Sequence, residues 1–221
     1  MKTYTETSDL VGEEYIAASV ETPLRKDAFD LEDIIKIELI QKHFKEIMTI
    51  LGLDLSDDSL SGTPHRVAKM YVKEIFRGLN PAHKPEVKLF ENKYQYNEML
   101  IEKNITLYSY CEHHFVPITG KVHVAYISNG QVIGLSKINR LVQYYAKRPQ
   151  VQERLTNQIA AGLKEALQSE DVAVIIDAVH LCVASRGIKD THSSTVTTSY
   201  SGRFHGEKLK TEFLALLNST K

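Results

Sequence analysis

The 221-residue sequence has few cysteines, almost no net charge and no long apolar run, and each shortage excludes a class of protein. Two cysteines are too few for the disulfide framework of a small secreted domain. A formal net charge of −1 provides no overall field that would attract nucleic acid or an anionic membrane. No apolar run approaches the roughly 18 residues of a spanning helix, and the first residues lack the apolar core of a signal peptide. We therefore expect a cytoplasmic protein with reduced thiols that binds neither nucleic acid nor membranes.

The overall composition is that of an ordinary globular protein, with 43% hydrophobic and 25% charged residues. A chain of this length can bury one good core and still carry an appendage. Residues 1–30 are polar and have no sustained period, so we expect a flexible N-terminal arm there. Residues 31–80 are expected to form an N-terminal helical region, and residues 81–221 the main domain.

Within residues 30–53, apolar side chains recur at three- and four-residue intervals, which predicts an amphipathic helix. Asp30 is a candidate cap for the first helix. The second helix is expected within residues 61–80, where Thr63 can cap it and Pro64 suits its first position. Gly78 is expected to end this second helix.

From about Ile105 the sequence alternates between apolar and polar residues, which predicts strands separated by helical segments. The expected order of helices, two or more strands, two helices, two strands and a last helix predicts an α+β fold. In such a fold an antiparallel sheet carries helices packed on one face. The expected strands are 105–111, 120–127, 172–185 and 193–204, and the expected helices are 135–147, 149–168 and 206–219.

Both cysteines have a histidine two residues away on a strand-like segment. Cys111 is followed by His113 and His114, and Cys182 is preceded by His180. In a straight strand Cys111 and His113 would share a face, whereas a bend at the strand end would bring His114 to Cys111 instead. His180 and Cys182 are expected to share a face of their own strand. If the two strands lie side by side, two thiols and up to three imidazoles come together.

Thiolates and imidazoles are preferred zinc ligands, and a catalytic zinc site uses three protein ligands and keeps one position for water. Each Cys–His pair alone would be better explained as a buried thiol beside a satisfied histidine, but the two pairs together favour a catalytic metal site. A structural zinc site more often shows Cys-x-x-Cys pairs, which the chain lacks. The zinc deaminase pattern is also absent. A disulfide between the two cysteines stays open from sequence, although a reducing compartment argues against it.

Four long motifs resemble those of the GTP cyclohydrolase I family, namely "TPHRVAKMYVKEIFRGL", "CEHHFVPITGKVHVAYI", "VIGLSKINRLVQYYAKRPQVQERLT" and "IDAVHLCVASRGIKDTHSSTVTTS". The resemblance runs from about residue 32 to residue 217 in the same order and without large gaps. It implies that residues 81–221 form a catalytic tunnelling-fold (T-fold) domain. It also implies zinc-dependent conversion of GTP to 7,8-dihydroneopterin triphosphate and formate, the first step of tetrahydrofolate and pterin biosynthesis.

The resemblance assigns roles to the Cys–His residues. It implies that the zinc ligands are Cys111, His114 and Cys182, and that His113 and His180 are the catalytic histidines. The implied hydrolytic steps need an activated water, which an open zinc position can supply. Histidine suits proton transfer because its pKa lies near working pH.

The resemblance also implies a substrate site. Glu153, beside Gln152, falls where the family holds guanine, although without the family we would interpret Glu153 as an acid favoured by a helix N-terminus. Without the family, most of the implied phosphate contacts would likewise be interpreted as a solvated helix face. The implied contacts to ribose and triphosphate are Ser136, Lys137, Arg140, Arg186, Arg66 and Lys69.

The resemblance further implies a ring-shaped homodecamer of two pentamers, in which sheets join edge to edge and active sites lie at subunit boundaries. Two other functions stay open. One is a nitrile reductase on the same fold that uses a cysteine nucleophile, which would leave the two Cys–His clusters hard to explain. The other is a zinc-stabilised scaffold that binds a pterin or nucleotide without catalysis, which would not need His113 beside His114.

Overall fold

A computed structural model describes residues 21–219, so most of the arm expected at residues 1–30 lies outside the described residues. The centre of the fold is a five-stranded sheet with the order β5-β2-β3-β6-β7, and β1 and β4 form a separate two-stranded sheet. Neighbouring strands are antiparallel except β2 and β5. The strands are β1 (Leu89–Glu91), β2 (Met99–Cys111), β3 (Pro117–Ile127), β4 (Gln131–Ile133), β5 (Pro149–Gln150), β6 (Val172–His180) and β7 (Thr195–Tyr200).

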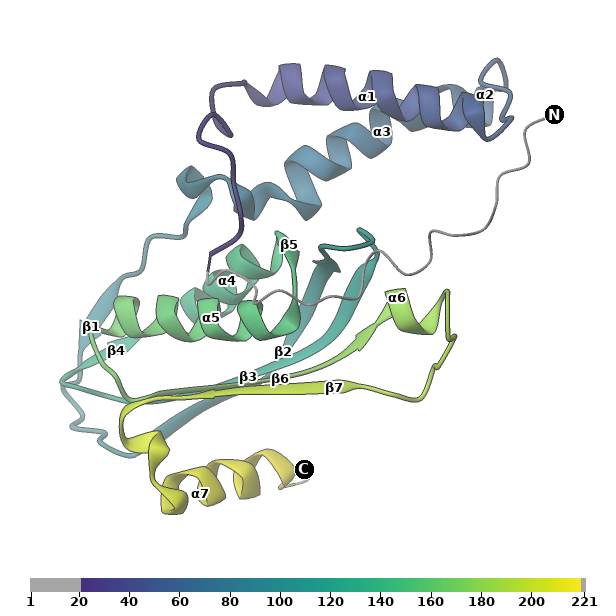
Figure 1. The fold of residues 1–221 in the computed structure, drawn as a ribbon. Helices are drawn as coiled ribbons and strands as arrows, with labels where there is room; N and C mark the ends of the chain where they lie inside the picture. Colours follow the sequence, from purple (N-terminus) through teal and green to yellow (C-terminus); the bar gives the residue numbers. More distant parts are fainter. Residues whose placement is uncertain (1–20, 220–221) are drawn as a thin grey trace.

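Two helices, α4 and α5, cover one face of the large sheet, and a helical layer of α1 to α3 lies beyond them (Figure 1). The α-helices are α1 (Asp33–Ile50), α2 (Asp58–Ser61), α3 (Thr63–Met70), α4 (Leu135–Ala146), α5 (Gln152–Leu167), α6 (Leu181–Ala184) and α7 (Glu207–Asn218). The shorter turns are a π-helical segment η1 (Tyr71–Ile75) and the 3-10 segments η2 (Arg77–Leu79), η3 (Pro81–His83) and η4 (Gly202–His205). No helix of residues 21–219 has both the length and the apolar character that crossing a bilayer requires.

Alternation along β6 divides the core between the two faces of the sheet. Val174 and Ile176 belong to the large cluster beneath α4 and α5. Ala173 and Ile175 point to the opposite face, where a smaller cluster includes Phe213 of α7. The α+β fold is confirmed, with α4 and α5 on one face as expected, and α7 additionally covers part of the other face (Figure 1). Because β6 is buried on both faces, its sequence is a nearly continuous apolar run.

The expected helix starts differ from the observed ones at three positions. The Thr63 cap is wrong, because Thr63 is already the first residue of α3 and the residue before it, Gly62, has no side chain to cap the helix. The Asp30 cap is wrong, because α1 begins at Asp33 after Glu32 and has no side-chain cap. Pro149 does not open a helix either. It lies in β5 and is paired with Tyr110 of β2, which holds this segment extended until α5 begins.

Gly78 does not end a regular α-helix, because α3 already ends at Met70 and passes through η1 into η2. The glycine is needed for a close approach instead. A Cβ on it would lie 2.8 Å from the Lys147 carbonyl oxygen and would overlap that of Tyr144.

The sheet also needs a glycine at residue 120, and this generates a stability prediction. A Cβ on Gly120 of β3 would overlap the Asp177 carbonyl oxygen and Ala178 of β6. We therefore expect Gly120→Ala to lower the free energy of unfolding by about 1–3 kcal/mol, measured by chemical denaturation at a fixed protein concentration. Gly134→Ala is the matched control, because its new Cβ would meet neighbours only at 3.8 Å and 3.9 Å. Equal losses in the two variants would contradict this explanation.

Candidate functional site

Three potential metal ligands from two distant parts of the chain meet at one end of the large sheet. The Sγ atoms of Cys111 and Cys182 and a ring nitrogen of His114 all lie within 4.8 Å of one another. The Cys111 Sγ is 3.8 Å from Nδ1 of His114. Tetrahedral zinc, with Zn–S about 2.3 Å and Zn–N about 2.0–2.1 Å, separates such ligand atoms by about 3.6 Å. The donor set and its spacing therefore fit a zinc ion.

The chain after β2 bends so that His114, rather than His113, joins this group. Phe115 donates its backbone N–H to the Cys111 carbonyl at 2.9 Å, and Cys111 donates to the Val116 carbonyl at 2.9 Å. Phe115 adopts a positive φ of 54°, which closes the tight turn. Of the two arrangements that the sequence left open, the structure has the bend.

The second thiol does not lie on a strand, so the expectation that His180 and Cys182 share a strand face is wrong. Strand β6 ends at His180, and Cys182 lies in the single turn of α6. Ser185 stabilises this turn because both its N–H and its hydroxyl donate to the Leu181 carbonyl. Burial raises the pKa of the Cys182 thiol, and the neighbouring Cys111 adds to this rise. A cation between the two sulfurs would reverse it, because metals bind the thiolate form.

His113 lies beside the ligand group without belonging to it. Its side chain is exposed, and its Nδ1 is 3.7 Å from the Cys111 Sγ. Its Nε2 is 3.9 Å from a carboxylate oxygen of Glu112. An exposed imidazole in this position can exchange protons with a substrate bound next to the metal.

Glu112 is anchored by Arg154 of α5, and the sequence analysis missed both residues. The guanidinium forms a two-pronged ion pair with the carboxylate, in which the longer contact, from Nη2 to Oε1, is 3.3 Å. Arg154 is only 5% exposed, so this pair is held firmly under the histidine turn. Two features of the sequence could have indicated this ion pair. One is the acidic residue between Cys111 and His113, and the other is the arginine among the buried positions of α5.

Gln152 holds the second histidine. Its side-chain nitrogen donates to the Thr195 carbonyl at 2.8 Å and to the Thr197 hydroxyl at 3.1 Å. Its oxygen is therefore the acceptor for Nε2 of His180 at 2.8 Å. This arrangement puts a proton on Nε2 and leaves Nδ1 as the acceptor of the ring. Burial lowers the pKa of His180, and the nearby Glu153 partly opposes this shift, so the neutral imidazole is favoured.

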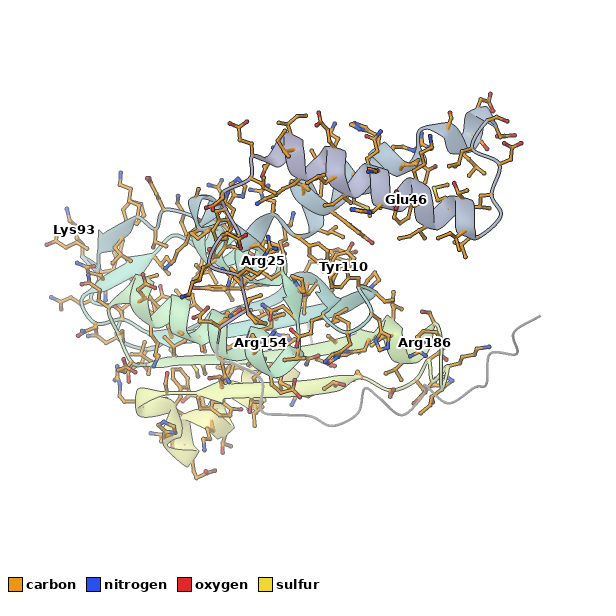
Figure 2. All side chains as sticks on the ribbon, turned by 45° about the horizontal axis from the view of Figure 1, so that its top comes forward. Arg25, Glu46, Lys93, Tyr110, Arg154 and Arg186 are labelled. Atoms are coloured by element: carbon orange, nitrogen blue, oxygen red, sulfur yellow. The ribbon has the colours of Figure 1, made fainter. Side chains whose placement is uncertain are left out.

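Three of the eight predicted substrate contacts lie near this centre, and Gln152, which holds His180, is one of them. Glu153 is exposed in the first turn of α5, next to the buried Gln152. Arg186 lies in the loop beyond α6 (Figure 2), and its Nη1 is 3.2 Å from Nε2 of His114. Arg186 thus lies beside the ligand group and Glu153 beside His180, and the substrate roles of these residues stay predictions.

Three of the remaining predicted contacts lie far from this centre within one chain. Ser136, Lys137 and Arg140 lie on α4, whose Asn139 contacts Glu102 near the far end of β2. Nine residue steps along β2 lead from Glu102 to Cys111, which is about 30 Å. The remaining two lie on α3, where Arg66 donates to the Ser59 carbonyl at 3.0 Å and Lys69 is exposed. The ring of Tyr71, two residues after Lys69, packs against that of Phe115, which follows His114.

Comparison with known proteins identifies the family. Residues 40–218 match the family described as GTP cyclohydrolase I. The chain is similar to "GTP cyclohydrolase 1" of Flavobacterium johnsoniae, with 61% identity over 206 residues that cover 93% of this chain and 92% of that protein. It is also similar to the proteins of the same name from Citrobacter koseri, at 52% identity, and Salmonella arizonae, at 53%, each covering 97% of both chains. The chain therefore belongs to the GTP cyclohydrolase I family, whose members are hydrolases of the cyclic amidine type.

Proposed function

We propose that this protein is a zinc-dependent enzyme that converts GTP to 7,8-dihydroneopterin triphosphate and formate, as the first step of tetrahydrofolate and pterin biosynthesis. The observation that carries the proposal is the group formed by Cys111, His114 and Cys182. A zinc ion held by these residues would act as a Lewis acid that makes water a stronger nucleophile near neutral pH. Hydrolysis at C8 of guanine, which releases formate, needs such a nucleophile.

His113 and His180 supply the proton transfers in this proposal. His113 is exposed next to the ligand group, where it can donate a proton to N7 of the purine as water adds at C8. His180 acts in the later rearrangement of the ribose. Its fixed tautomer supports that role, because Gln152 holds Nε2–H and the ring can accept a proton only at Nδ1.

Glu153 holds guanine in this proposal. Guanine presents N1–H and its 2-amino group as neighbouring donors, and one carboxylate can accept a hydrogen bond from each. The exposed position of Glu153, close enough to influence His180, supports this assignment. Gln152 then acts behind it as the residue that orients His180.

A ring of copies, proposed as a homodecamer of two pentamers, completes the site. Along its outer side β2 pairs only through Tyr110 and Cys111, and within residues 21–219 β7 has a single neighbour, β6. Open edges of this length favour pairing with another copy. Joining β2 of one chain to β7 of the next would bring α4 toward the Gln152–Thr195 edge of its neighbour. This supports a phosphate site in which Ser136, Lys137 and Arg140 come from a second chain.

The same proposal includes Arg186, Arg66 and Lys69 as further phosphate contacts, because all three are exposed cations. It places the reaction in the cytoplasm, where reducing conditions keep the two thiols available to the metal.

Removing one sulfur tests the metal assignment. We expect Cys182→Ser to lose bound zinc and to lower formate release by at least about a hundredfold, because the ion loses a thiolate ligand. Zinc would be measured by elemental analysis, and formate together with the pterin chromophore after addition of GTP. His205→Ala, a change of an exposed histidine in η4, is the control and should retain both. Full turnover in a zinc-free preparation would refute the zinc assignment.

Replacing His113 separates proton transfer from metal binding. We expect His113→Ala to retain zinc and GTP binding but to lower formate release by about 10²–10⁴-fold, the usual contribution of a general acid. Equilibrium binding of GTP and zinc analysis would be performed on the same preparation. A turnover rate near that of the unaltered protein would exclude His113 from the chemistry.

A carboxylate-to-amide change tests the guanine contact. We expect Glu153→Gln to weaken GTP binding by about 10-fold or more, because one acceptor of the pair becomes a donor. Glu165→Gln is the matched control, since it removes the same charge from the far end of the same helix. If both variants bind GTP equally well, Glu153 is only a favourable first-turn acid.

A further inference from the structure

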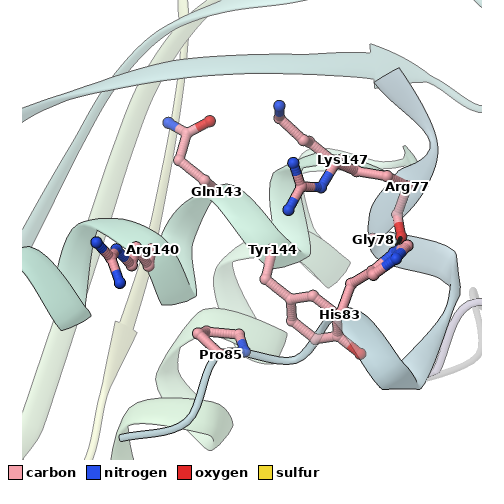
Figure 3. A pocket seen from close by; sticks show the side chains of 8 residues that line it. All are labelled: Arg77, Gly78, His83, Pro85, Arg140, Gln143, Tyr144 and Lys147. Atoms are coloured by element: carbon pink, nitrogen blue, oxygen red, sulfur yellow. Dashed lines mark hydrogen bonds between the residues drawn. The ribbon is translucent and has the colours of Figure 1, made fainter. Parts of the chain in front are cut away.

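A basic cavity of about 440 Å³ lies between α4 and the chain that follows α3 (Figure 3). Arg77, His83, Arg140 and Lys147 are among the residues that line it, and none of its lining residues is an acid. Among the ion pairs within residues 21–219, none includes Arg77, Arg140 or Lys147. The cavity therefore concentrates positive charge that the described part of the chain does not neutralise, which favours an anion.

The backbone holds two of these cations next to each other. Gly78 donates its N–H to the Lys147 carbonyl at 2.9 Å, and its own carbonyl accepts from the Arg148 side chain at 2.8 Å. Only a glycine allows this approach, because a Cβ would overlap the Tyr144 carbonyl oxygen. Arg77, the residue before Gly78, is thereby fixed beside the C-terminal end of α4. The backbone contacts of Gly78 therefore position Arg77 without a bound ligand.

Besides Arg77, two positively charged residues line the cavity from one face of α4. Arg140, Gln143 and Lys147 are three and four residues apart, so they lie along the same side of the helix. Gln143 is fixed by donating to the Thr106 carbonyl of β2 at 2.7 Å. Figure 3 shows its side chain and that of Lys147 on the same side of α4, with Arg77 close by.

The spacing of these groups indicates the chemistry of the ligand. Lys147, the C-cap of α4, is seven positions after Arg140, which is about 10 Å along the helix axis. One phosphate group is too short to contact both, whereas a chain of phosphates can span them. Guanidinium groups bind phosphate oxygens in pairs, and a lysine adds a point charge. The cavity is thus suited to a linear polyphosphate.

We propose that this cavity binds the phosphate chain of the substrate, with Arg77 and Lys147 as binding residues in addition to Arg140. The inference rests on the proposed function, because the guanine end would lie at the Cys111–Cys182 centre of the neighbouring copy. The cavity lies beside Thr106 of β2, whose carbonyl accepts from Gln143, and within residues 21–219 the outer side of β2 pairs with a strand only at Tyr110 and Cys111. The phosphate site therefore extends beyond the residues that the family resemblance implied.

Two single substitutions test the proposal in the full-length protein. We expect Arg77→Ala and Lys147→Ala each to raise KM for GTP about tenfold, with a smaller change in kcat, because a charge-assisted contact to phosphate is lost. Inorganic tripolyphosphate should compete with GTP, and its inhibition constant should rise by a similar factor in the same variants. Lys93→Ala is the control, since this exposed lysine lies outside the cavity and should leave both constants unchanged. Lys147→Gln, measured alongside the melting temperature, replaces any alanine variant that fails to fold.

The possible outcomes separate this inference from the proposed function. An unchanged KM in both folded variants overturns the inference while the enzyme assignment stands. Weaker tripolyphosphate inhibition with an unchanged KM also overturns it, because the cavity then serves free polyphosphate rather than substrate. If the unaltered protein releases no formate from GTP, the proposed function fails. Equilibrium binding of GTP then decides the inference: weaker binding in the variants supports it, and equal binding overturns it.

Discussion

The register of β3 between β2 and β6 is the constraint on which the candidate site depends. Ile118 is paired with Ser109 on one side and with His180 on the other. This places the last residues of β2 and β6 at the same end of the sheet, so that a short turn after each strand brings Cys111 and Cys182 together. A slip of one residue would turn the side chains of a strand to the opposite face and separate the sulfurs. In the second half of β2, buried and more exposed residues alternate, and this alternation opposes such a slip and so keeps the ligand group together.

Buried polar contacts next to the group of Cys111, His114 and Cys182 hold the side chains of the site in fixed positions. Gln152 is 1% exposed and uses its amide to join His180 to β7. Arg154, on the same helix, fixes Glu112 and hence the turn that carries the histidines. Such satisfied networks hold reactive groups in one geometry, and losing one partner would leave another buried polar group unpaired. Helix α5 thus holds His180 and the turn that carries His113 and His114 in place.

Much of this could be predicted from the sequence, because periodicity reports which face is buried. Strand β3, the second half of β2 and helices α4 and α7 follow from apolar spacing, and the pairing of each cysteine with a histidine indicated the ligand group. The first half of β2, from Met99, was missed, because the register shift between Glu102 and Ile105 interrupts the alternation. Periodicity could not predict the turn of α6, because the strand pattern of β6 continues through "VHLCVAS" while Ser185 closes a helical turn. It also could not predict the ion pair of Glu112 with Arg154, since such contacts depend on tertiary packing across 42 residues. The basic cavity was missed for the same reason, as Arg77 and Lys147 meet only because Gly78 docks on α4.

The distance between the two ends of β2 matters when one ring contains both intact and defective chains. One end carries the ligand group, and α4 begins near the other, with the predicted phosphate contacts Ser136 and Lys137 in its first turn. In the proposed ring each chain would therefore serve two reaction centres, its own and that of a neighbour. A single defective chain would then silence two centres, so a heterogeneous ring would lose a larger share of its turnover than its share of defective chains.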